Sequence, residues 1–120
     1  MDGYGLKRII RTLCMTMEHK SLFGSFIRLH ILHHAALDAI YGQWITQELA
    51  HHGYRLSAGT LYPLLHDMEK KGYLVSTAER NGKTTRRLYR ATPAGVDALA
   101  AAKGKLRELF GELLRHDAPG

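Results

Sequence analysis

Apolar residues recur at helical spacing in four stretches of the first part of the chain. Within residues 1–24 they share one face and basic residues the other, which predicts an extra N-terminal helix. The run at 25–36 is so densely apolar that we expect a largely buried helix. Amphipathic runs at 42–53 and 57–72 each end at a glycine, and the second opens on a serine, a favoured N-cap residue. The pattern therefore predicts four helices.

Two short runs rich in aromatic and β-branched residues, YLVSTAE and TTRRLYRAT, follow these helices. They are separated by RNGK, in which Asn81-Gly82 is a strong hairpin signal. Alternation along the second run places Leu88 on one face and Arg87 and Tyr89 on the other. The pattern predicts a two-stranded β ribbon with Asn81-Gly82 at its tip.

The last helix is predicted to begin at Thr92-Pro93, an N-cap followed by proline at the first helical position, and to run to about Arg115. Its apolar residues alternate at spacings of three and four, as in a coiled-coil seam, if Lys103 is accepted as a polar member. The seam consists of Val96, Leu99, Leu106, Phe110 and Leu113. The stripe could pack on its own domain, but so short a chain offers few partners. We therefore interpret it as a dimerisation surface.

This order of elements is the plan of a winged helix-turn-helix. The expected fold class is mainly α with a small β hairpin (α+β). We divide the chain into a helical N-terminal extension (1–24), a winged helix-turn-helix DNA-binding domain (25–91), a C-terminal dimerisation helix (92–116) and a tail (117–120).

Composition restricts the partners and the compartment. Seventeen Lys and Arg against eleven Asp and Glu give a formal charge of +6 and a pI near 9.7, which favours nucleic acid or an acidic membrane surface. No stretch approaches the roughly 20 apolar residues of a membrane span, and residues 1–24 lack a secretory cleavage pattern, so we expect a soluble protein without a membrane partner. The single cysteine, Cys14, is expected to pack as a small apolar residue and fits a reducing cytoplasm.

The helix predicted at 57–72 is expected to enter the major groove of double-stranded DNA. Its opening offers small residues, the hydroxyls of Ser57, Thr60 and Tyr62, and backbone N–H groups suited to a phosphate oxygen. Thr60 and Leu61 could meet thymine methyl groups. The hairpin concentrates positive charge in Arg80, Lys83, Arg86, Arg87 and Arg90, and phosphate or minor-groove contact is expected from its tip. In the alternative interpretation these charges are only solvated, Ser57 is only a cap and Tyr62 only packs against the hairpin.

A resemblance to a known family rests on three motifs: the stretch GYRLSAGTLYPLLHDMEKKGYL, R-x-Y at 87–89 and T-P-A-G at 92–95. Over about 25–114 the chain resembles the PadR family of bacterial transcriptional regulators, in its short form with one C-terminal dimerisation helix. The resemblance implies a homodimer that represses by binding an inverted-repeat operator and is released by a small-molecule or other effector. No cofactor is expected. The DNA-facing positions implied by the resemblance are Tyr41, Ser57, Gly59, Thr60, Tyr62, Lys83 and Arg86.

Histidine is abundant, and His30, His33 and His34 fall at a spacing that can place three imidazoles on one helix face. A metal-responsive regulator is therefore an alternative, although no carboxylate or cysteine lies close in sequence and we assign no metal ligand. The chain departs from the family's frequent second tyrosine after Tyr41-Gly42 and has Gln43-Trp44 there. Trp44 could line a pocket for an effector near the dimer interface, or it could pack in the core.

Two further classes of protein fit these features less well. An enzyme is not expected, because the chain has no Gly-rich phosphate loop, nucleophile elbow or paired carboxylates. A winged-helix protein-interaction module is the other alternative, and the basic recognition surface argues against it.

Overall fold

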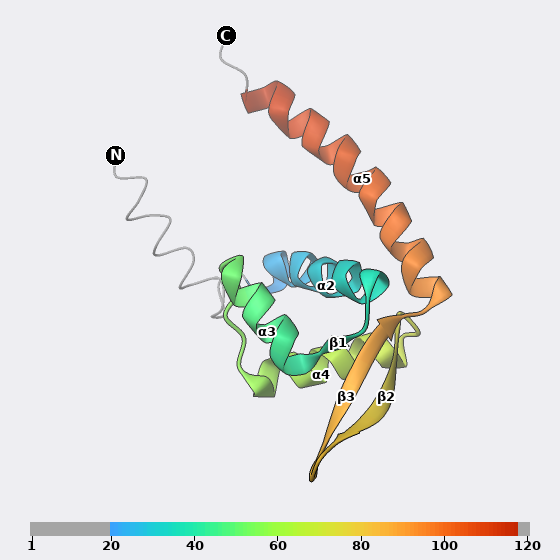
Figure 1. Ribbon diagram of the computed structural model, residues 1–120. Helices are drawn as coiled ribbons and strands as arrows, with labels where there is room; N and C mark the ends of the chain where they lie inside the picture. The colour runs from blue at the N-terminus through green and yellow to red at the C-terminus, as the bar shows by residue number, and fades with distance from the viewer. Residues whose placement is uncertain (1–19, 118–120) are drawn as a thin grey trace.

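The computed structural model describes residues 20–117 (Figure 1). The elements in chain order are α2 (Lys20–Leu37), β1 (Ile40–Tyr41), α3 (Gly42–His51), α4 (Ala58–Lys70), β2 (Leu74–Asn81), β3 (Thr84–Ala91) and α5 (Pro93–Asp117). Helix α2 starts ahead of the expected Ser25, and α5 extends beyond Arg115. The predicted extra N-terminal helix up to residue 19, Cys14 and the tail after Asp117 lie outside the described residues.

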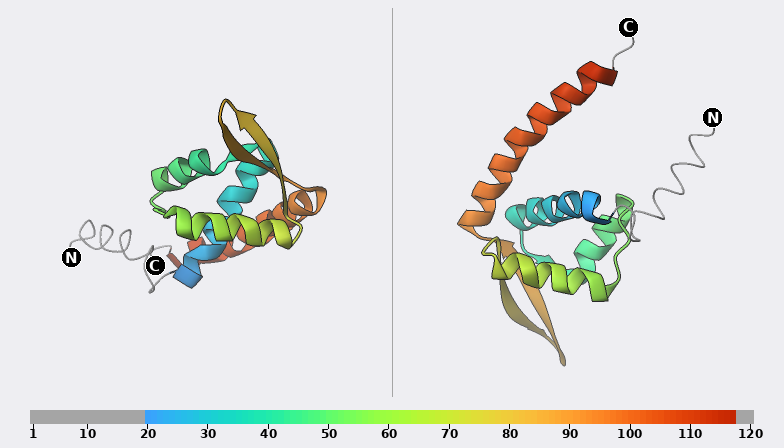
Figure 2. Two further views of the ribbon diagram at one scale, coloured as in Figure 1. Left: turned by 90° about the horizontal axis from the view of Figure 1, so that it is seen from below. Right: turned by 180° about the vertical axis from the view of Figure 1, so that it is seen from behind.

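Helix α2 lies at the centre of the hydrophobic core, as its dense apolar run predicts. Its buried residues are Ile27, Ile31, Leu32 and Ala35. Around it pack side chains of α3, α4, α5 and the sheet, which are Ile40, Ile45, Leu49, Leu61, Leu65, Met68, Leu74, Tyr89 and Leu99. Burial of apolar surface stabilises such a core by roughly 25 cal/mol per Å². From this body the β2–β3 hairpin, the wing, and the helix α5 leave on opposite sides (Figures 1 and 2).

Helices α3 and α4 end in the same way. Gly53 and Gly72 adopt positive φ angles of 91° and 87°, which confirms the predicted glycine stops. The N–H of the next residue then donates back to a carbonyl of the last turn, Tyr54 to Leu49 at 2.8 Å and Tyr73 to Met68 at 2.9 Å. Both helices therefore close with the Schellman arrangement, in which a left-handed residue satisfies the last carbonyls.

The sheet has three antiparallel strands in the order β1-β3-β2. The predicted two-stranded ribbon is present, and the short strand β1 adds to it by pairing Ile40 with Tyr89 and Tyr41 with Leu88. Tyr89 is buried and Leu88 is half-buried, and the two lie on opposite faces of β3 as alternation predicts. No sequence pattern predicts strand β1, because two residues are too few to show a periodicity and the strand forms only by pairing with the distant β3.

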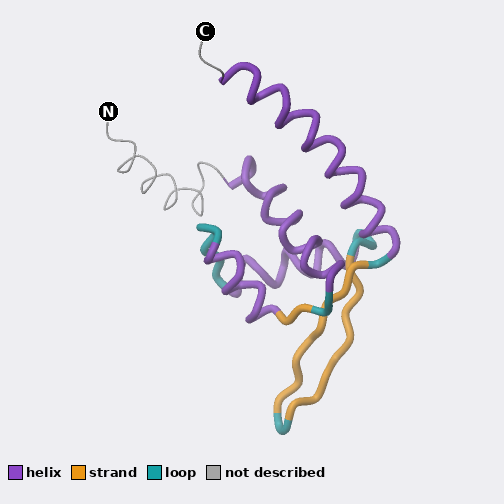
Figure 3. The backbone as a smooth tube through the Cα atoms, turned by 45° about the horizontal axis from the view of Figure 1, so that its top comes forward, coloured by secondary structure: helices purple, strands orange, loops and turns teal. Residues whose placement is uncertain are grey.

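The tip of the wing differs by one residue from the prediction. Asn81 pairs with Thr84, so the two-residue loop consists of Gly82-Lys83 rather than Asn81-Gly82. Gly82 has a φ of 65°, and positive φ at the first loop position is the pattern of a type II′ turn. The wing thus presents Lys83 at its end and projects well clear of the helices (Figure 3).

Three elements meet where α5 begins. The Thr92 hydroxyl accepts the N–H of Gly95 at 2.9 Å, which confirms the predicted N-cap, and donates to the carbonyl of Gly72. The Thr92 N–H donates to the carbonyl of Tyr73 at 3.0 Å. A Cβ atom at Gly95 would lie 2.2 Å from that carbonyl oxygen. The T-P-A-G motif is therefore a junction that needs a threonine cap and a glycine.

Substituting Gly95 tests this junction. We expect Gly95→Ala to lower the free energy of unfolding by about 1–3 kcal/mol, because the clash is with backbone that cannot rotate away. Gly104→Ala, on the same helix with open space around it, should instead raise stability by up to about 1 kcal/mol. Urea denaturation followed by circular dichroism measures both, and equal stability of Gly95→Ala and the unsubstituted chain would contradict the packing argument.

Candidate nucleic-acid interface

The start of α4 is an exposed surface of small and hydroxyl-bearing residues. Ser57 occupies the N-cap position, but its hydroxyl makes no capping bond to the backbone and lies 3.3 Å from the Thr60 hydroxyl. Gly59 is exposed, and a Cβ atom there would meet nothing closer than 3.8 Å. The fold itself therefore does not require a glycine at this position. The first turn of a helix also leaves backbone N–H groups without partners inside the helix.

Leu61 is a correction to the predicted DNA-facing set. It is 0% exposed and belongs to the hydrophobic core. The physical reason is the helical repeat, which turns Leu61, Leu65 and Met68 to the same inner face of α4. The thymine contact proposed for it is therefore wrong, and Thr60 is the remaining candidate for that contact.

Tyr62 connects the start of α4 to the start of α3. Its side chain is 46% exposed. A Cβ atom at Gly42 would lie 2.5 Å from the Tyr62 hydroxyl oxygen, so the ring occupies the space that Gly42 leaves open. A cavity of about 270 Å³ separates the ring from the wing. It is lined by Tyr41, Gly42, Gln43, Tyr62, Thr85, Arg86, Arg87 and Tyr89. The start of α3, the first turns of α4 and strand β3 of the wing thus share one hollow, and three predicted DNA-facing residues line it, Tyr41, Tyr62 and Arg86.

The outer face of the sheet carries a ring of three polar contacts. The Tyr41 hydroxyl donates to Glu79 Oε1 at 2.7 Å, and Arg86 Nη2 lies 3.7 Å from the same oxygen. The Arg86 guanidinium carbon lies 4.1 Å from the centre of the Tyr41 ring, a cation–π distance. The hydrogen bond to Glu79 raises the pKa of Tyr41 above its usual value. Two predicted DNA-facing residues are therefore held by one carboxylate.

Glu79 was not among the residues selected from the sequence. Its signal lay in the hairpin register, because counting pairs outward from a Gly82-Lys83 loop places Glu79 directly opposite Arg86. With Asn81-Gly82 taken as the loop, that pairing is displaced. The error at the tip therefore concealed the partner of Arg86.

A second polar network joins the end of α4 to the inner face of the wing. Glu69 accepts the N–H of Ser76 at 3.1 Å and the Ser76 hydroxyl at 2.8 Å. Arg87 Nη1 in turn donates to the Ser76 hydroxyl oxygen at 3.1 Å. Burial raises the pKa of Tyr89 beside this network, and the Glu69 charge raises it further. The network fixes the base of the wing relative to the helix predicted to enter the groove.

The stripe along α5 divides into a buried and an exposed part. Leu99 is 7% exposed and lies in the core of its own domain, because the first turns of α5 pack against α2. Its assignment to the dimer seam is thus corrected. Exposed apolar residues on the rest of the helix are Val96, Leu106, Leu109, Phe110, Leu113 and Leu114. Leu109 and Leu114 widen the predicted seam, and Phe110 is its most exposed member at 61%.

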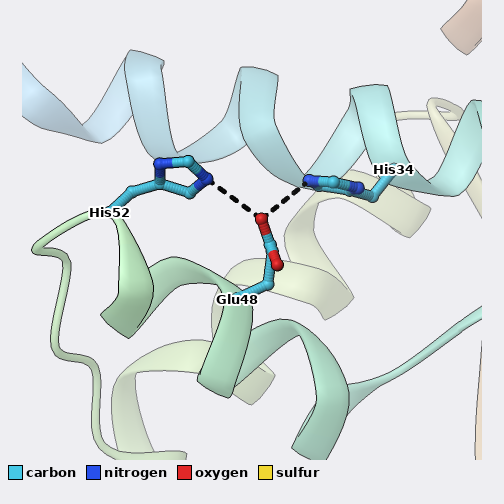
Figure 4. A network of polar contacts seen from close by, with 3 residues as sticks. All are labelled: His34, Glu48 and His52. Carbon is cyan, nitrogen blue, oxygen red and sulfur yellow. Dashed lines mark hydrogen bonds and ion pairs between the residues drawn. The ribbon is translucent and has the colours of Figure 1, made fainter.

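Imidazoles gather between α2 and α3 around Glu48. Figure 4 shows Glu48 reaching from α3 between the other two side chains, with its Oε2 3.5 Å from His34 Nε2 and 3.0 Å from His52 Nε2. His30 stacks on His52 with ring centroids 4.7 Å apart. The fold thus supplies the carboxylate that the sequence places far away. Among residues 20–117, however, no group of three or more His, Cys, Asp or Glu side chains is arranged to hold a metal ion. The metal-responsive alternative gains no support from them.

Trp44 belongs to the same aromatic region. Its indole makes an edge-to-face contact with His34, with centroids 5.2 Å apart, and it is 44% exposed. The core-packing interpretation is therefore wrong, since the ring lies at the surface of α3. Its part in an effector pocket stays a prediction, and it lines neither the hollow beside the wing nor the groove between α2 and α5.

The arrangement of α3, α4 and the basic hairpin defines a winged helix-turn-helix of the kind that binds DNA. Residues 31–101 match the Transcriptional regulator PadR-like family, and the chain belongs to this family. It is therefore a transcriptional regulator rather than an enzyme. In the part of the chain that the structure describes, no helix is long and apolar enough to cross a membrane.

Relatives of known name and structure agree with this assignment. The chain is 54% identical over 88 residues to the transcriptional regulator Rv3488 of Mycobacterium tuberculosis, covering 73% of this chain and 82% of that protein. A PadR family regulator from Eggerthella lenta has a similar structure, with a TM-score of 0.74 at 23% identity over 97% of this chain and 98% of that one. A PadR-like regulator from Bacillus cereus also gives 0.74, at 22% identity over 83% and 99%. The structural likenesses confirm the fold.

The histidine cluster leads to a prediction about pH. Burial lowers the pKa of His30 and His34 below the usual 6.5, and charge on neighbouring imidazoles lowers them further, against the opposing effect of Glu48. In the unfolded chain these histidines bind protons as the pH falls through 6.5, whereas in the folded chain they bind them only at lower pH. The free energy of unfolding should therefore be highest above pH 6.5 and should decrease as the pH falls through the folded-state pKa values.

Urea denaturation at about pH 7.5 and about pH 5.5 measures this effect. The doubly substituted chain His30→Gln, His34→Gln should lose less stability between the two pH values than the unsubstituted chain. His66→Gln, at an exposed position of α4 outside the cluster, should leave the loss unchanged. An identical pH response in all three chains would count against the histidine cluster as its origin.

Proposed function

We propose that this chain is a homodimeric repressor that binds an inverted-repeat DNA operator and is released by an effector. The observation that carries the proposal is the exposed start of α4 lying across a hollow from a basic wing. Such a regulator acts where bacterial DNA is, in the cytoplasm. The domain limits of 25–91 for DNA binding and 92–116 for dimerisation remain part of the proposal.

The DNA contacts divide between the helix and the wing. At the start of α4, Ser57 and Thr60 present hydroxyls beside Gly59, which lets the backbone approach a phosphate or a base edge closely. On the wing, Lys83 at the tip and Arg86 on the outer face supply positive charge. Few long polar side chains lie on α4, so DNA shape and apolar contact should share in the readout.

The dimer contact is proposed for the exposed stripe of α5. Apolar residues from Leu109 to Leu114 lie on α5 beyond the domain core and are exposed, while Leu106 lies at the edge of the groove beside α2. Contiguous exposed apolar surface of this kind marks an interaction site, and a second copy with the same stripe provides a self-complementary partner. Two-fold symmetry would set two α4 helices about 34 Å apart, one DNA turn.

Release by an effector is proposed to act through α5. A groove of about 330 Å³ lies beside it, and its lining includes Phe26, His30, Tyr54, Lys103 and Leu106. A ligand that changed the packing of α5 on α2 would alter the distance between the two wings. The half-sites would then fit less well, and affinity for the operator would fall.

Gly59→Ala tests the DNA contact without disturbing the fold. There is room for the new methyl group, so the free energy of unfolding should be unchanged or up to about 1 kcal/mol higher. The same methyl group would keep the helix start away from DNA, and we expect affinity for the operator to fall about tenfold, or about 1.4 kcal/mol. Fluorescence anisotropy with an operator selected by the purified protein from a random duplex library measures it.

Two outcomes would contradict the proposal. If selection enriches no sequence, the protein does not bind DNA as an operator-specific regulator. If an operator is found and Gly59→Ala binds it with unchanged affinity, the start of α4 is not the contact surface. Ala94→Gly also changes one methyl group, at an exposed position on the first turn of α5, and as the control it should leave affinity for the operator unchanged.

Phe110→Glu tests the dimer. Placing a charge in the middle of the exposed stripe should convert the dimer to a monomer in sedimentation equilibrium, because a buried unpaired carboxylate is strongly disfavoured. Ala101→Glu, on the opposite side of α5 by the 3.6-residue repeat, should leave the dimer intact. A chain that is monomeric before any substitution would rule out this interface.

A further inference from the structure

The wing contains one acidic residue among its basic residues. Between Leu74 and Ala91 the only carboxylate is Glu79, whereas five Arg and Lys residues lie in the same segment. A negative charge on a surface that approaches phosphates weakens binding to any DNA sequence by Coulomb repulsion. The position of Glu79 is therefore unfavourable for DNA affinity.

Both partners of Glu79 are residues proposed to face DNA. The sheet register places Glu79 opposite Arg86 and Tyr41 opposite Leu88, so Tyr41, Glu79 and Arg86 share the outer face. Each member touches the other two, through the hydrogen bond of 2.7 Å, the ion pair of 3.7 Å and the stacking of Arg86 on Tyr41 at 4.1 Å. Without the carboxylate, Arg86 would keep only the ring contact and gain rotamer freedom.

We propose that Glu79 is a positioning residue that holds the Tyr41 hydroxyl and the Arg86 guanidinium in one arrangement, exchanging general DNA affinity for discrimination between operator and other DNA. This inference rests on the proposed function, in which Tyr41 and Arg86 contact DNA. Arg86 has five N–H donors, and the ion pair with Glu79 leaves donors available for a phosphate. A guanidinium held in one orientation can donate well-aligned hydrogen bonds to phosphate oxygens only where the DNA backbone has the shape of the operator.

The first test compares operator with scrambled DNA of equal length, by anisotropy. Glu79→Ala should bind scrambled DNA more tightly, because repulsion is removed, while the ratio of operator affinity to scrambled affinity falls about fivefold to tenfold. Glu79→Gln keeps an acceptor for Tyr41 but loses the charge facing Arg86. Its ratio of operator affinity to scrambled affinity should lie between those of the unsubstituted chain and Glu79→Ala. Asp97→Asn, which removes an exposed carboxylate on α5, should leave the ratio unchanged. An unchanged ratio in Glu79→Ala would overturn the proposal.

A double-mutant cycle shows whether Glu79 acts through Arg86. In an Arg86→Ala chain there is no guanidinium to orient, so adding Glu79→Ala should change the operator ratio much less than it does alone. If the two effects are additive, the carboxylate acts only as a local charge and the positioning role is wrong. Circular dichroism of each variant checks that it remains folded.

A measurement without DNA separates this inference from the proposed function. The hydrogen bond to Glu79 raises the pKa of Tyr41 above its usual value of 10.0. Tyrosine carbon NMR over a pH titration, with Tyr41→Phe to assign the resonance, should show that pKa move back toward 10.0 in Glu79→Ala. No movement would overturn the positioning role whatever the DNA results. Absence of operator preference in the unsubstituted chain would overturn the proposed function, while this titration would still decide whether Glu79 holds Tyr41.

Discussion

The arrangement of the whole molecule depends on a few backbone contacts around Tyr73. Its N–H closes α4 by bonding to Met68, and its carbonyl receives the N–H of Thr92, where β3 ends and α5 begins. Gly95 packs directly against that carbonyl. Because one residue joins the end of α4, the base of the wing and the start of α5, the orientation of α5 is coupled to that of α4. A change of packing at the proposed dimer contact of α5 would therefore have a short path to the proposed DNA surface of α4.

The wing directs its two adjacent arginines by two different carboxylates. Arg86 and Arg87 point to opposite faces of the sheet, as neighbours in a strand must. On the outer face Glu79 pairs with Arg86, and on the inner face Glu69 reaches Arg87 through Ser76. Glu69 comes from α4 and Glu79 from β2. The wing is therefore a basic ribbon in which Arg86 and Arg87 are held on opposite faces, and the contact to Arg87 comes through Glu69 of the neighbouring helix α4.

Sequence patterning predicted most of the fold because the decisive features are local. The glycine stops of α3 and α4, the Thr92 cap and the period of two along β3 each depend on a few neighbouring residues. Strand β1 depends on pairing with a distant segment, and no local pattern marks it. The helical repeat of α4 places Leu61 on the buried face, although its position near the helix start favours a contact with DNA.

Contacts between elements limited the prediction of the site. Glu48 lies beside His34, and Trp44 against the same imidazole, only because α2 and α3 pack together. Glu79 combines two such cases: its pairing with Arg86 follows from a Gly82-Lys83 loop, and its contact with Tyr41 depends on the long-range pairing of β1 with β3. Leu99 was counted in a regular stripe, although the first turns of α5 belong to the domain and only the later turns leave it. Spacing along one helix does not say where a neighbouring helix stops covering it.

Helix α5 is anchored to the domain near its start, where Gly95 packs against the carbonyl of Tyr73. At 1.5 Å per residue its 25 residues span about 37 Å, and its buried residues, Gly95 and Leu99, lie near its start. A rotation of about 5° at the junction displaces the far end by about 3 Å, close to half the pitch of a helix. A small rearrangement of the α2 side chains that contact α5 would thus become a larger displacement at the C-terminal end of α5. Conversely, holding that end fixed would restrict how far the domain can rotate at the start of α5.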